Sequence, residues 1–126
     1  MSDGKSVVVA FFAAVNSEGM GALRRFVTDD MTWWAPGLGE LAAQKLISMV
    51  ESLTSLLDQP IRFTVHDIIV EGDRVAAEVE SYAALKSGKI YNNKYHFKFT
   101  VRAGAIAKIR EYHDTKHAFE VFDLHG

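Results

Sequence analysis

Four ionisable residues in the second half of the sequence have the types and spacing for acid–base chemistry. Glu78 and Glu80 are two residues apart, as are Glu111 and His113. Residues two apart in a β-strand point to the same face, so each pair can approach a substrate from one side. A carboxylate held away from water can serve as a general base near neutral pH, and a histidine can pass on the proton. We therefore expect Glu111 to act as the base, assisted by Glu80 and His113.

The strands that must position these residues are indicated by alternation of apolar and polar side chains. The alternation is clearest over residues 91–101, where every second residue after Asn93 is aromatic or aliphatic. We expect this set, with Asn93, to face the core. Similar patterns or β-rich composition, bounded by turn residues, predict strands at 62–70, 75–85 and 105–113. The second half of the chain is thus predicted to form four consecutive antiparallel strands.

The length of each turn decides which residues lie opposite one another across this sheet. A two-residue hairpin loop at Ser87-Gly88 would place Tyr95 opposite Glu80. The same step across the preceding turn would place Asp67 opposite Glu78. Directly opposed residues share a face. The predicted inner face therefore carries, beside its aromatic side chains, a set of polar residues: Asp67, Glu78, Glu80, Tyr82, Asn93, Glu111 and His113.

Two interpretations of this inner face remain open. In the first, the register is shifted by one residue or the acids sit at an open rim, and the carboxylates are solvated. In the second, sheet and helices enclose a ligand cavity in which burial raises the pKa of a carboxyl group. The cavity interpretation predicts ligand contacts from six residues: Asp67, Glu78, Tyr82, Asn93, Tyr95 and Phe97.

Some of the candidate residues also have a purely structural explanation. Glu111 could form an ion pair with a helix residue such as Arg24 or Lys45. His113 could be a rim histidine without a chemical role. It lies four residues before His117, but the two span a strand end and a helix start, so we expect no metal site.

Helices are predicted in the first half of the chain and at its end. Apolar residues at helical spacing indicate helices over 4–16 and 41–57, and a shorter one over 20–26. Residues 30–36 are predicted to form a short strand, and a final helix is expected after a cap at residue 114 or 115. This order predicts an α+β fold, a curved antiparallel sheet with helices packed on its concave face.

The composition fits one domain covering residues 1–126, with 48% hydrophobic and 24% charged residues and no composition break. A net charge of −2 offers no basic surface for nucleic acid. The longest apolar run, Val7–Val15, is too short to span a bilayer, and no signal-cleavage site follows it. We expect a cytoplasmic protein without nucleic-acid or membrane partners. Without cysteine or nucleotide-binding motifs, we also expect no cofactor and no metal.

Two segments, together with the element order, resemble a known group of proteins. They are Asp29-Asp30…Trp33…Pro36-Gly37 and the run from Tyr91 to Thr115. Over essentially the whole chain they resemble the SnoaL-like, ketosteroid-isomerase-related proteins of the NTF2-like superfamily. The resemblance implies a cone-shaped α+β barrel with a deep apolar pocket between sheet and helices. It also implies Trp33 as a pocket wall and a homodimer formed through the outer sheet face.

The functional residues of that superfamily match this chain unevenly. Steroid isomerases keep a catalytic aspartate before the proline that follows the first strand, where this chain has Ala35. Their oxyanion-binding tyrosine is matched by Phe11, so steroid isomerisation itself is not expected. Epoxide-hydrolase relatives carry an Arg-x-Asp pair and a further aspartate on the last strand. The matching positions here are Glu78, Glu80 and Glu111.

Three functions therefore remain open. The first is a cofactor-free acid–base enzyme, of isomerase, cyclase or hydrolase type, acting on a small apolar molecule that is cyclic or polyketide-like. The second is a protein that binds a hydrophobic ligand without catalysis. The third is a dimerising interaction module. Residues expected to face outward toward a second copy are Val79, Ala83, Ile106 and Tyr112.

Overall fold

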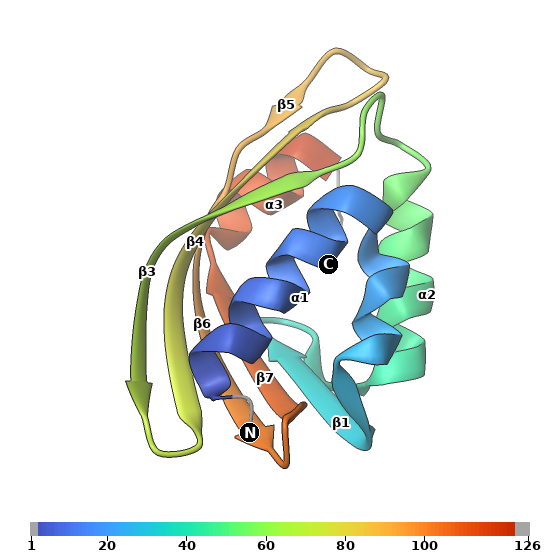
Figure 1. The fold of residues 1–126 in the computed structure, drawn as a ribbon. Coiled ribbons are helices and arrows are strands. Elements are labelled where there is room, and N and C mark those ends of the chain that lie inside the picture. Colours follow the sequence, from blue (N-terminus) through green and yellow to red (C-terminus); the bar gives the residue numbers. More distant parts are fainter. Residues whose placement is uncertain (1–2, 123–126) are drawn as a thin grey trace.

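A curved sheet forms one side of the molecule, and α1 and α2 lie on its concave side (Figure 1). The computed structural model describes residues 3–122. In chain order the elements are α1 (Gly4–Glu18), the 3-10 helix η1 (Met20–Arg25), β1 (Val27–Ala35), β2 (Gly39–Ala42), α2 (Ala43–Thr54), β3 (Arg62–Glu71), β4 (Arg74–Ala84), β5 (Ile90–Tyr91), β6 (Lys94–Arg102), β7 (Ala105–His113) and α3 (Thr115–Phe122). The predicted α+β fold is confirmed.

In the sheet, the first strand of the chain, β1, lies beside the last strand, β7. The order of strands is β2-β1-β7-β6-β4-β3, with β5 paired to the end of β4. Neighbouring strands are antiparallel except β1 and β7, which are parallel. Two features were not predicted, namely this parallel pair and the strand β2. Because β2 takes up Leu41 and Ala42, α2 begins at Ala43.

The first helix carries the apolar stripe that its spacing predicts. Asp3 caps α1, since its carboxylate accepts a hydrogen bond from the Ser6 backbone N–H at 2.7 Å. Phe11 and Phe12 pack on the sheet against Phe99, with ring centroids 6.3 and 6.0 Å away. A fully buried side chain of this size contributes about 1.5–3 kcal/mol to folding. No helix within residues 3–122 is long and apolar enough to span a bilayer.

The register between β4 and β6 differs from the prediction by one residue. The loop that joins β4 to β5 has three residues, since the Leu85 N–H donates to the Lys89 carbonyl at 2.9 Å. Gly88 supplies the left-handed conformation (φ 93°) that such a loop requires. Val79 therefore lies opposite Tyr95. This shift turns three residues that were predicted to face inward onto the outer face: Glu78, Glu80 and Tyr82.

A β-bulge in β3 changes the face of a fourth predicted residue. Asp67 does lie opposite Glu78, but the pairing shifts between Val65 and Asp67. Val65 consequently faces the helices, while Asp67 is exposed. The Asp67 carboxylate accepts a hydrogen bond from the Ile68 N–H at 3.0 Å. The prediction of Asp67 as an inner residue was wrong, and its side chain instead satisfies a backbone donor on the edge strand.

The inner face of β6 agrees with the prediction, as does that of β7 from Ile109 onward, whereas a shift in the β6–β7 pairing turns Ile106 inward. Asn93, Tyr95, Phe97, Phe99 and Val101 are all buried. In β7, Ile109 is buried, and Glu111 and His113 are largely covered. Of the residues expected to face a second copy, three are buried, and Tyr112 alone is exposed, at 42%. The three buried ones are Val79, Ala83 and Ile106.

Candidate functional site

Glu111, His113 and Trp33 meet on the inner face of the sheet. β1 and β7 run side by side, with Trp33 opposite Ile109, so the indole reaches along β7 to the carboxylate. The Trp33 Nε1–H donates to Glu111 Oε1 at 2.9 Å. The other carboxylate oxygen, Oε2, lies 2.7 Å from His113 Nδ1. The Glu111 and His113 side chains are only 17% and 12% exposed, so the pair is largely withdrawn from water.

The contact between Glu111 and His113 is close but poorly aligned. His113 Nδ1 is buried and has no hydrogen bond of acceptable direction among the described residues, although the carboxylate is 2.7 Å away. Buried polar atoms are nearly always hydrogen-bonded, and exceptions mark strain, ordered water or a catalytic group. The expected ion-pair partners Arg24 and Lys45 form no bond to Glu111 in residues 3–122. The charge partner of Glu111 is thus a histidine, which is neutral or cationic according to its protonation.

Three buried hydroxyl groups lie next to this pair, and we refer to them as the hydroxyl cluster: Ser81, Tyr91 and Tyr95. The Tyr95 hydroxyl is 2.9 Å from both the Ser81 and the Tyr91 oxygen. The Tyr95 ring also packs on His113, with centroids 6.0 Å apart. Two hydrogen bonds join three hydroxyls, so any arrangement of the protons leaves one O–H to donate outside the cluster. A buried donor of this kind can stabilise an oxygen on which negative charge develops.

Burial keeps the two phenols of the hydroxyl cluster protonated. It raises the pKa of Tyr91 and raises the pKa of Tyr95 well above the usual range of a phenol. The charge of the Glu111 carboxylate acts in the same direction on both pKa values. The hydroxyl cluster therefore donates hydrogen bonds and does not supply a phenolate base.

Asn93 holds the hydroxyl cluster and the end of β7 in place. Its amide donates to the Tyr91 oxygen and to the Asp114 carbonyl, both at 3.0 Å. Its Oδ1 accepts from the backbone N–H groups of Lys94 and Asp114, at 2.8 and 3.2 Å. These four bonds use the whole hydrogen-bonding capacity of the amide. Asn93 is buried as predicted, but it anchors the residue that follows His113 and has no group left for a ligand.

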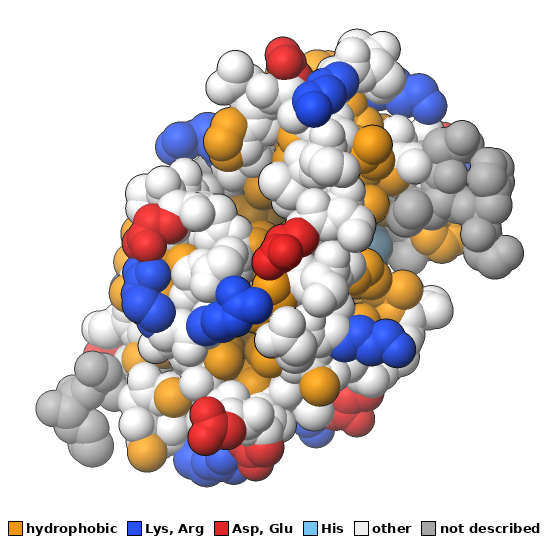
Figure 2. All heavy atoms as spheres, turned by 90° about the vertical axis from the view of Figure 1, so that its right-hand side faces the viewer, with side chains coloured by type: hydrophobic (Ala, Val, Ile, Leu, Met, Phe, Trp, Pro, Cys, Tyr) orange, Lys and Arg blue, Asp and Glu red, His pale blue; other side chains and the backbone are white. Residues whose placement is uncertain are grey.

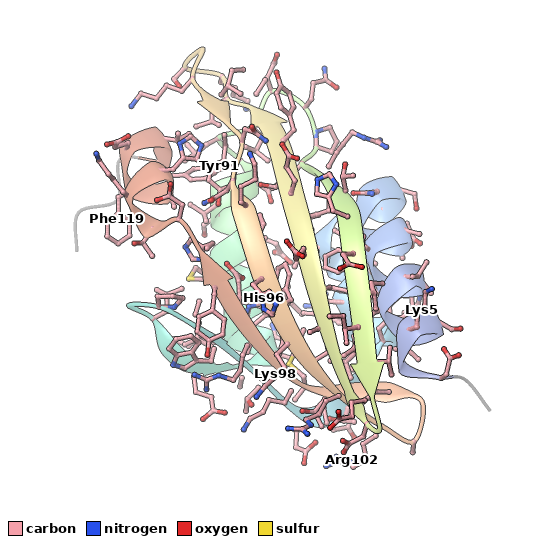
Figure 3. The ribbon with its side chains drawn as sticks, turned by 90° about the vertical axis from the view of Figure 1, so that its left-hand side faces the viewer. Lys5, Tyr91, His96, Lys98, Arg102 and Phe119 are labelled. Atoms are coloured by element: carbon pink, nitrogen blue, oxygen red, sulfur yellow. The ribbon has the colours of Figure 1, made fainter. Side chains whose placement is uncertain are left out.

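Glu80 lies on the outer face of the sheet and does not approach Glu111. Its carboxylate accepts hydrogen bonds from Asn92 and His66, at 2.8 and 2.9 Å, and lies 3.3 Å from the Lys94 ammonium. These partners, Asn92 foremost, lower the pKa of Glu80 to about 2. Figure 3 shows this convex face, where His96 and Lys98 project from β6. The prediction that Glu80 assists Glu111 from the same face was wrong.

Two members of the site were missed by the sequence analysis. Ser81 was missed because the assumed two-residue loop placed its neighbours Glu80 and Tyr82 inward. With a three-residue loop, which Gly88 at its last position permits, Ser81 would have been assigned to the inner face. Tyr91 was assigned to a strand without a role, although it stands two residues before Asn93 and so on the same face.

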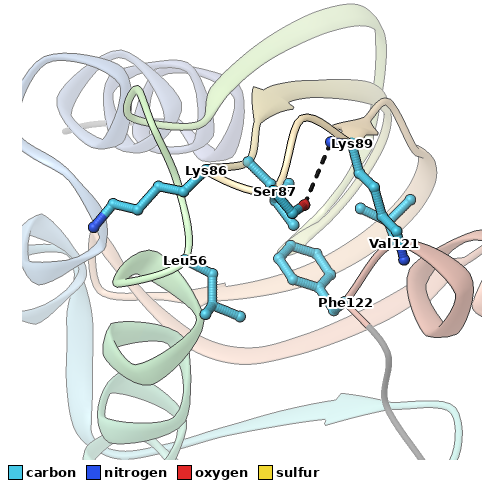
Figure 4. Close-up of a pocket in the computed structure, with 7 residues that line it drawn as sticks. Leu56, Lys86, Ser87, Lys89, Val121 and Phe122 are labelled. Carbon is cyan, nitrogen blue, oxygen red and sulfur yellow. Dashed lines mark hydrogen bonds between the residues drawn. The ribbon is translucent and has the colours of Figure 1, made fainter.

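Two hollows among the described residues lie away from Glu111. One, of about 300 Å³, lies between Leu56, the loop at residues 85–89 and the last turn of α3 (Figure 4). The other, of about 340 Å³, lies around Pro60 and Tyr82. Beside Glu111, the Trp33 and Phe97 rings pack edge to face with their centroids 6.1 Å apart. On the helix side of residues 3–122, charges of both signs are scattered among hydrophobic patches (Figure 2).

Comparison with known proteins assigns the fold. The structure is similar to TerC co-crystallised with polyporic acid, at 18% identity and a TM-score of 0.82, covering 98% of this chain and 100% of that one. It is similar to a putative SnoaL-like polyketide cyclase from Jannaschia sp. CCS1, at 15% identity, coverages of 97% and 92% and a TM-score of 0.80. An LEH-like epoxide hydrolase of M. tuberculosis gives 18% identity, coverages of 92% and 86% and a TM-score of 0.73.

At these identities the likeness shows the fold alone, which is NTF2-like. No curated protein matches the sequence significantly. Phe11 and Ala35, at the positions of the steroid-isomerase catalytic pair, are buried apolar residues. A family model for the SnoaL-like domain matches residues 8–109, most of the chain. The chain is therefore a member of the SnoaL-like domain family.

Proposed function

We propose that this SnoaL-like protein is a cofactor-free acid–base enzyme that acts on a small apolar substrate. The observation that carries the proposal is the largely buried Glu111 carboxylate, held by Trp33, touching His113 and lying beside the hydroxyl cluster. Proteins of the same fold include ones described as a putative polyketide cyclase and an epoxide hydrolase, which supports an enzymatic function.

The proposed reaction begins with proton abstraction next to a carbonyl group. Glu111 takes the proton from carbon, and the electron pair moves onto the carbonyl oxygen to form an enolate. The spare O–H of the hydroxyl cluster donates to that oxygen and stabilises its charge. In an isomerisation, Glu111 returns the proton to another carbon of the conjugated enolate. In a ring closure, the enolate carbon attacks a second carbonyl, whose electron pair moves onto its oxygen, and that oxygen takes the proton from Glu111. His113, 2.7 Å from Glu111, can receive the proton in between.

The test uses 5-nitrobenzisoxazole, a small apolar probe that a base opens by removing one proton from carbon. The wild-type protein should accelerate the opening, and Glu111→Gln should reduce the rate at least about 100-fold. Glu80→Gln removes a carboxylate from the outer face and should leave the rate unchanged. Glutamine keeps an oxygen acceptor for the Trp33 N–H, so the Glu111→Gln protein should stay folded. Equal rates for the wild type and Glu111→Gln would contradict the proposal.

The rate of probe opening in two tyrosine variants tests whether the hydroxyl cluster contributes to the reaction. Tyr95→Phe removes a hydroxyl from the hydroxyl cluster, whereas Tyr82→Phe removes one from a side chain that is 53% exposed on the outer face. We expect a slower rate for Tyr95→Phe alone. If both variants keep the wild-type rate while Glu111→Gln loses it, Glu111 is the base without help from the hydroxyl cluster.

We also infer that the outer sheet face binds a second copy of the chain. Trp34, Arg110 and Tyr112 form a stack there, in which Tyr112 is exposed and the other two are half-buried. The guanidinium lies 4.1 Å from the Trp34 ring centre, and its Nε–H donates to the Tyr112 hydroxyl at 3.1 Å. Residues of this kind are enriched at the centre of interfaces. Acids lie on β3 and β4 (Asp67, Glu78, Glu80), and bases lie on β6 and β7 (His96, Lys98, Arg110). A two-fold axis that lies in the interface and runs along the strands would place the acids of each copy over the bases of the other.

A further inference from the structure

We propose that the hollow beside the β4–β5 loop, which we call the loop hollow, binds an apolar molecule carrying one anionic group. Its volume is about 300 Å³, within the range of small-molecule sites. It lies between the segment after α2, the loop at residues 85–89 and the last turn of α3. Neither Glu111 nor His113 lines it, so this proposal stands apart from the acid–base function.

The walls of the loop hollow are apolar and held by backbone hydrogen bonds. Leu56, Leu85, Val121 and Phe122 supply the apolar surface. The Lys86 N–H donates to the Leu56 carbonyl at 2.9 Å, which ties the loop to the segment after α2. Leu85 and Val121 are only 6% and 9% exposed, so they belong to the core as well as to the wall. A hollow built on such elements is preorganised and loses little entropy when a ligand enters.

Lys86 and Lys89 are the charged residues among the described residues that line the loop hollow, and Ser87 adds a neutral hydroxyl. The Lys89 ammonium donates to the Glu120 carbonyl at the end of α3, at 3.0 Å, and this bond holds it in place. An ammonium group has three donors, so two remain for an anion. Figure 4 shows Lys86 extending away from Phe122, whereas Ser87 and Lys89 lie close to the apolar walls. One fixed cation over an apolar floor matches one anionic group on an apolar body.

The loop hollow adjoins the hydroxyl cluster through one side chain. The Phe122 ring lies 4.8 Å from the Tyr91 ring, centre to centre, and the Tyr91 hydroxyl belongs to the hydroxyl cluster. A ligand resting on Phe122 is therefore one aromatic ring away from the hydroxyl cluster. Its binding should be detectable in the resonances of Leu56 and Leu85 as well as in those of Tyr91.

The test compares two dyes that differ in charge. 8-Anilinonaphthalene-1-sulfonate is an apolar ring system with one sulfonate, and N-phenyl-1-naphthylamine has the same rings without it. Lys89→Gln should weaken sulfonate binding about tenfold and leave the neutral dye unaffected. Lys86→Gln, on the same loop but pointing away, is the matched control and should change neither affinity. Lys89→Arg keeps the charge and should restore sulfonate binding. Phe122→Ala should weaken both dyes.

Several outcomes would overturn the proposal. Equal losses of sulfonate affinity in the Lys86→Gln and Lys89→Gln proteins would mean general attraction by surface charge. Unchanged affinity for both dyes in Phe122→Ala would mean that they bind elsewhere. A wild-type protein that binds neither dye would refute the site directly. Circular dichroism of each variant confirms folding, and shifts of the Leu56 and Leu85 amide resonances on addition of the sulfonate locate the bound dye.

Discussion

Glu111 and Glu80 occupy opposite faces of one sheet, and their surroundings give the two carboxylates different chemistry. Glu80 is exposed and meets a lysine, a histidine and an asparagine amide, which lower its pKa to about 2. It is an anion throughout the neutral range and has little tendency to take a proton. Glu111 is largely covered, and its two contacts are the neutral Trp33 indole and His113. A carboxylate with few cationic partners and little water is the better base.

One residue of loop length decides which acids belong to which face. A two-residue loop between β4 and β5 would have placed Glu78 and Glu80 inside, among Tyr95 and Phe97. The observed three-residue loop places Val79 and Ser81 there instead. Side chains alternate strictly along a strand, so a shift of one position exchanges the complete sets of inner and outer residues. The apolar residues Val75 and Val79 would then have faced solvent, which favours the observed register.

Asn92 and Asn93 are neighbours in the sequence, but only Asn93 is buried on the inner face of the sheet. Replacing each by alanine should give the largest difference in the free energy of unfolding. Asn93→Ala removes four hydrogen bonds in a buried setting and leaves the Asp114 N–H without the acceptor that it has in the wild type. We expect a loss of about 3 kcal/mol in the free energy of unfolding. Asn92→Ala removes three side-chain hydrogen bonds at a half-buried position, two donated to Glu80 and the Ser81 carbonyl and one accepted from the exposed Lys94 ammonium, and should cost about 1 kcal/mol. Urea unfolding followed by circular dichroism measures both. Equal losses would contradict the role of Asn93 as an anchor.

The sequence predicted those parts of the fold that depend on local patterns. The apolar stripe of α1, the inner residues of β6 and the bounds of β7 follow from spacing within single elements. Glu111 and His113 were correctly assigned to the inner face. Lys108 and Arg110 were expected to face solvent, and side chains alternate along a strand, so the residues between and after them face inward. Asp114 caps α3 as expected, accepting from the His117 N–H at 3.2 Å.

The features that were not predicted depend on residues far apart in the sequence or on backbone irregularities. The Trp33–Glu111 bond joins residues 78 positions apart, and the parallel pairing of β1 with β7 brings them together. No local pattern reports that pairing. The bulge in β3 reverses the face of Asp67. Two consecutive polar residues, His66 and Asp67, interrupt the alternation there, but such an interruption does not by itself specify a bulge. The composition of the site was thus partly predictable, and its geometry required the tertiary structure.

The outer face should lose its proposed partner when a charge is placed in its aromatic stack. Wild-type protein should sediment at twice the 14.0 kDa chain mass. Tyr112→Asp should weaken dimerisation at least about tenfold, since truncating a central aromatic residue commonly costs over 1 kcal/mol. Phe119→Asp is the matched control, because Phe119 is similarly exposed (45% against 42%) but lies on α3. Analytical ultracentrifugation distinguishes the species. A wild-type protein that remains monomeric at tens of micromolar would refute the dimer.

The smallest expected effect is the dependence of stability on the charge of Glu80. Its pKa is lowered to about 2 in the folded protein from an ordinary value of 4.5, so the folded state binds its proton less readily than the unfolded chain does. The stabilisation is therefore fully present above pH 4.5 and is lost as the pH falls toward 2. The difference in urea midpoint between wild type and Glu80→Gln should shrink over this interval. Added salt should reduce the difference at neutral pH, because the cluster is exposed. A difference that persists unchanged to pH 2 would show that Glu80 stabilises by packing, and the contrast with Glu111 would then rest on burial alone.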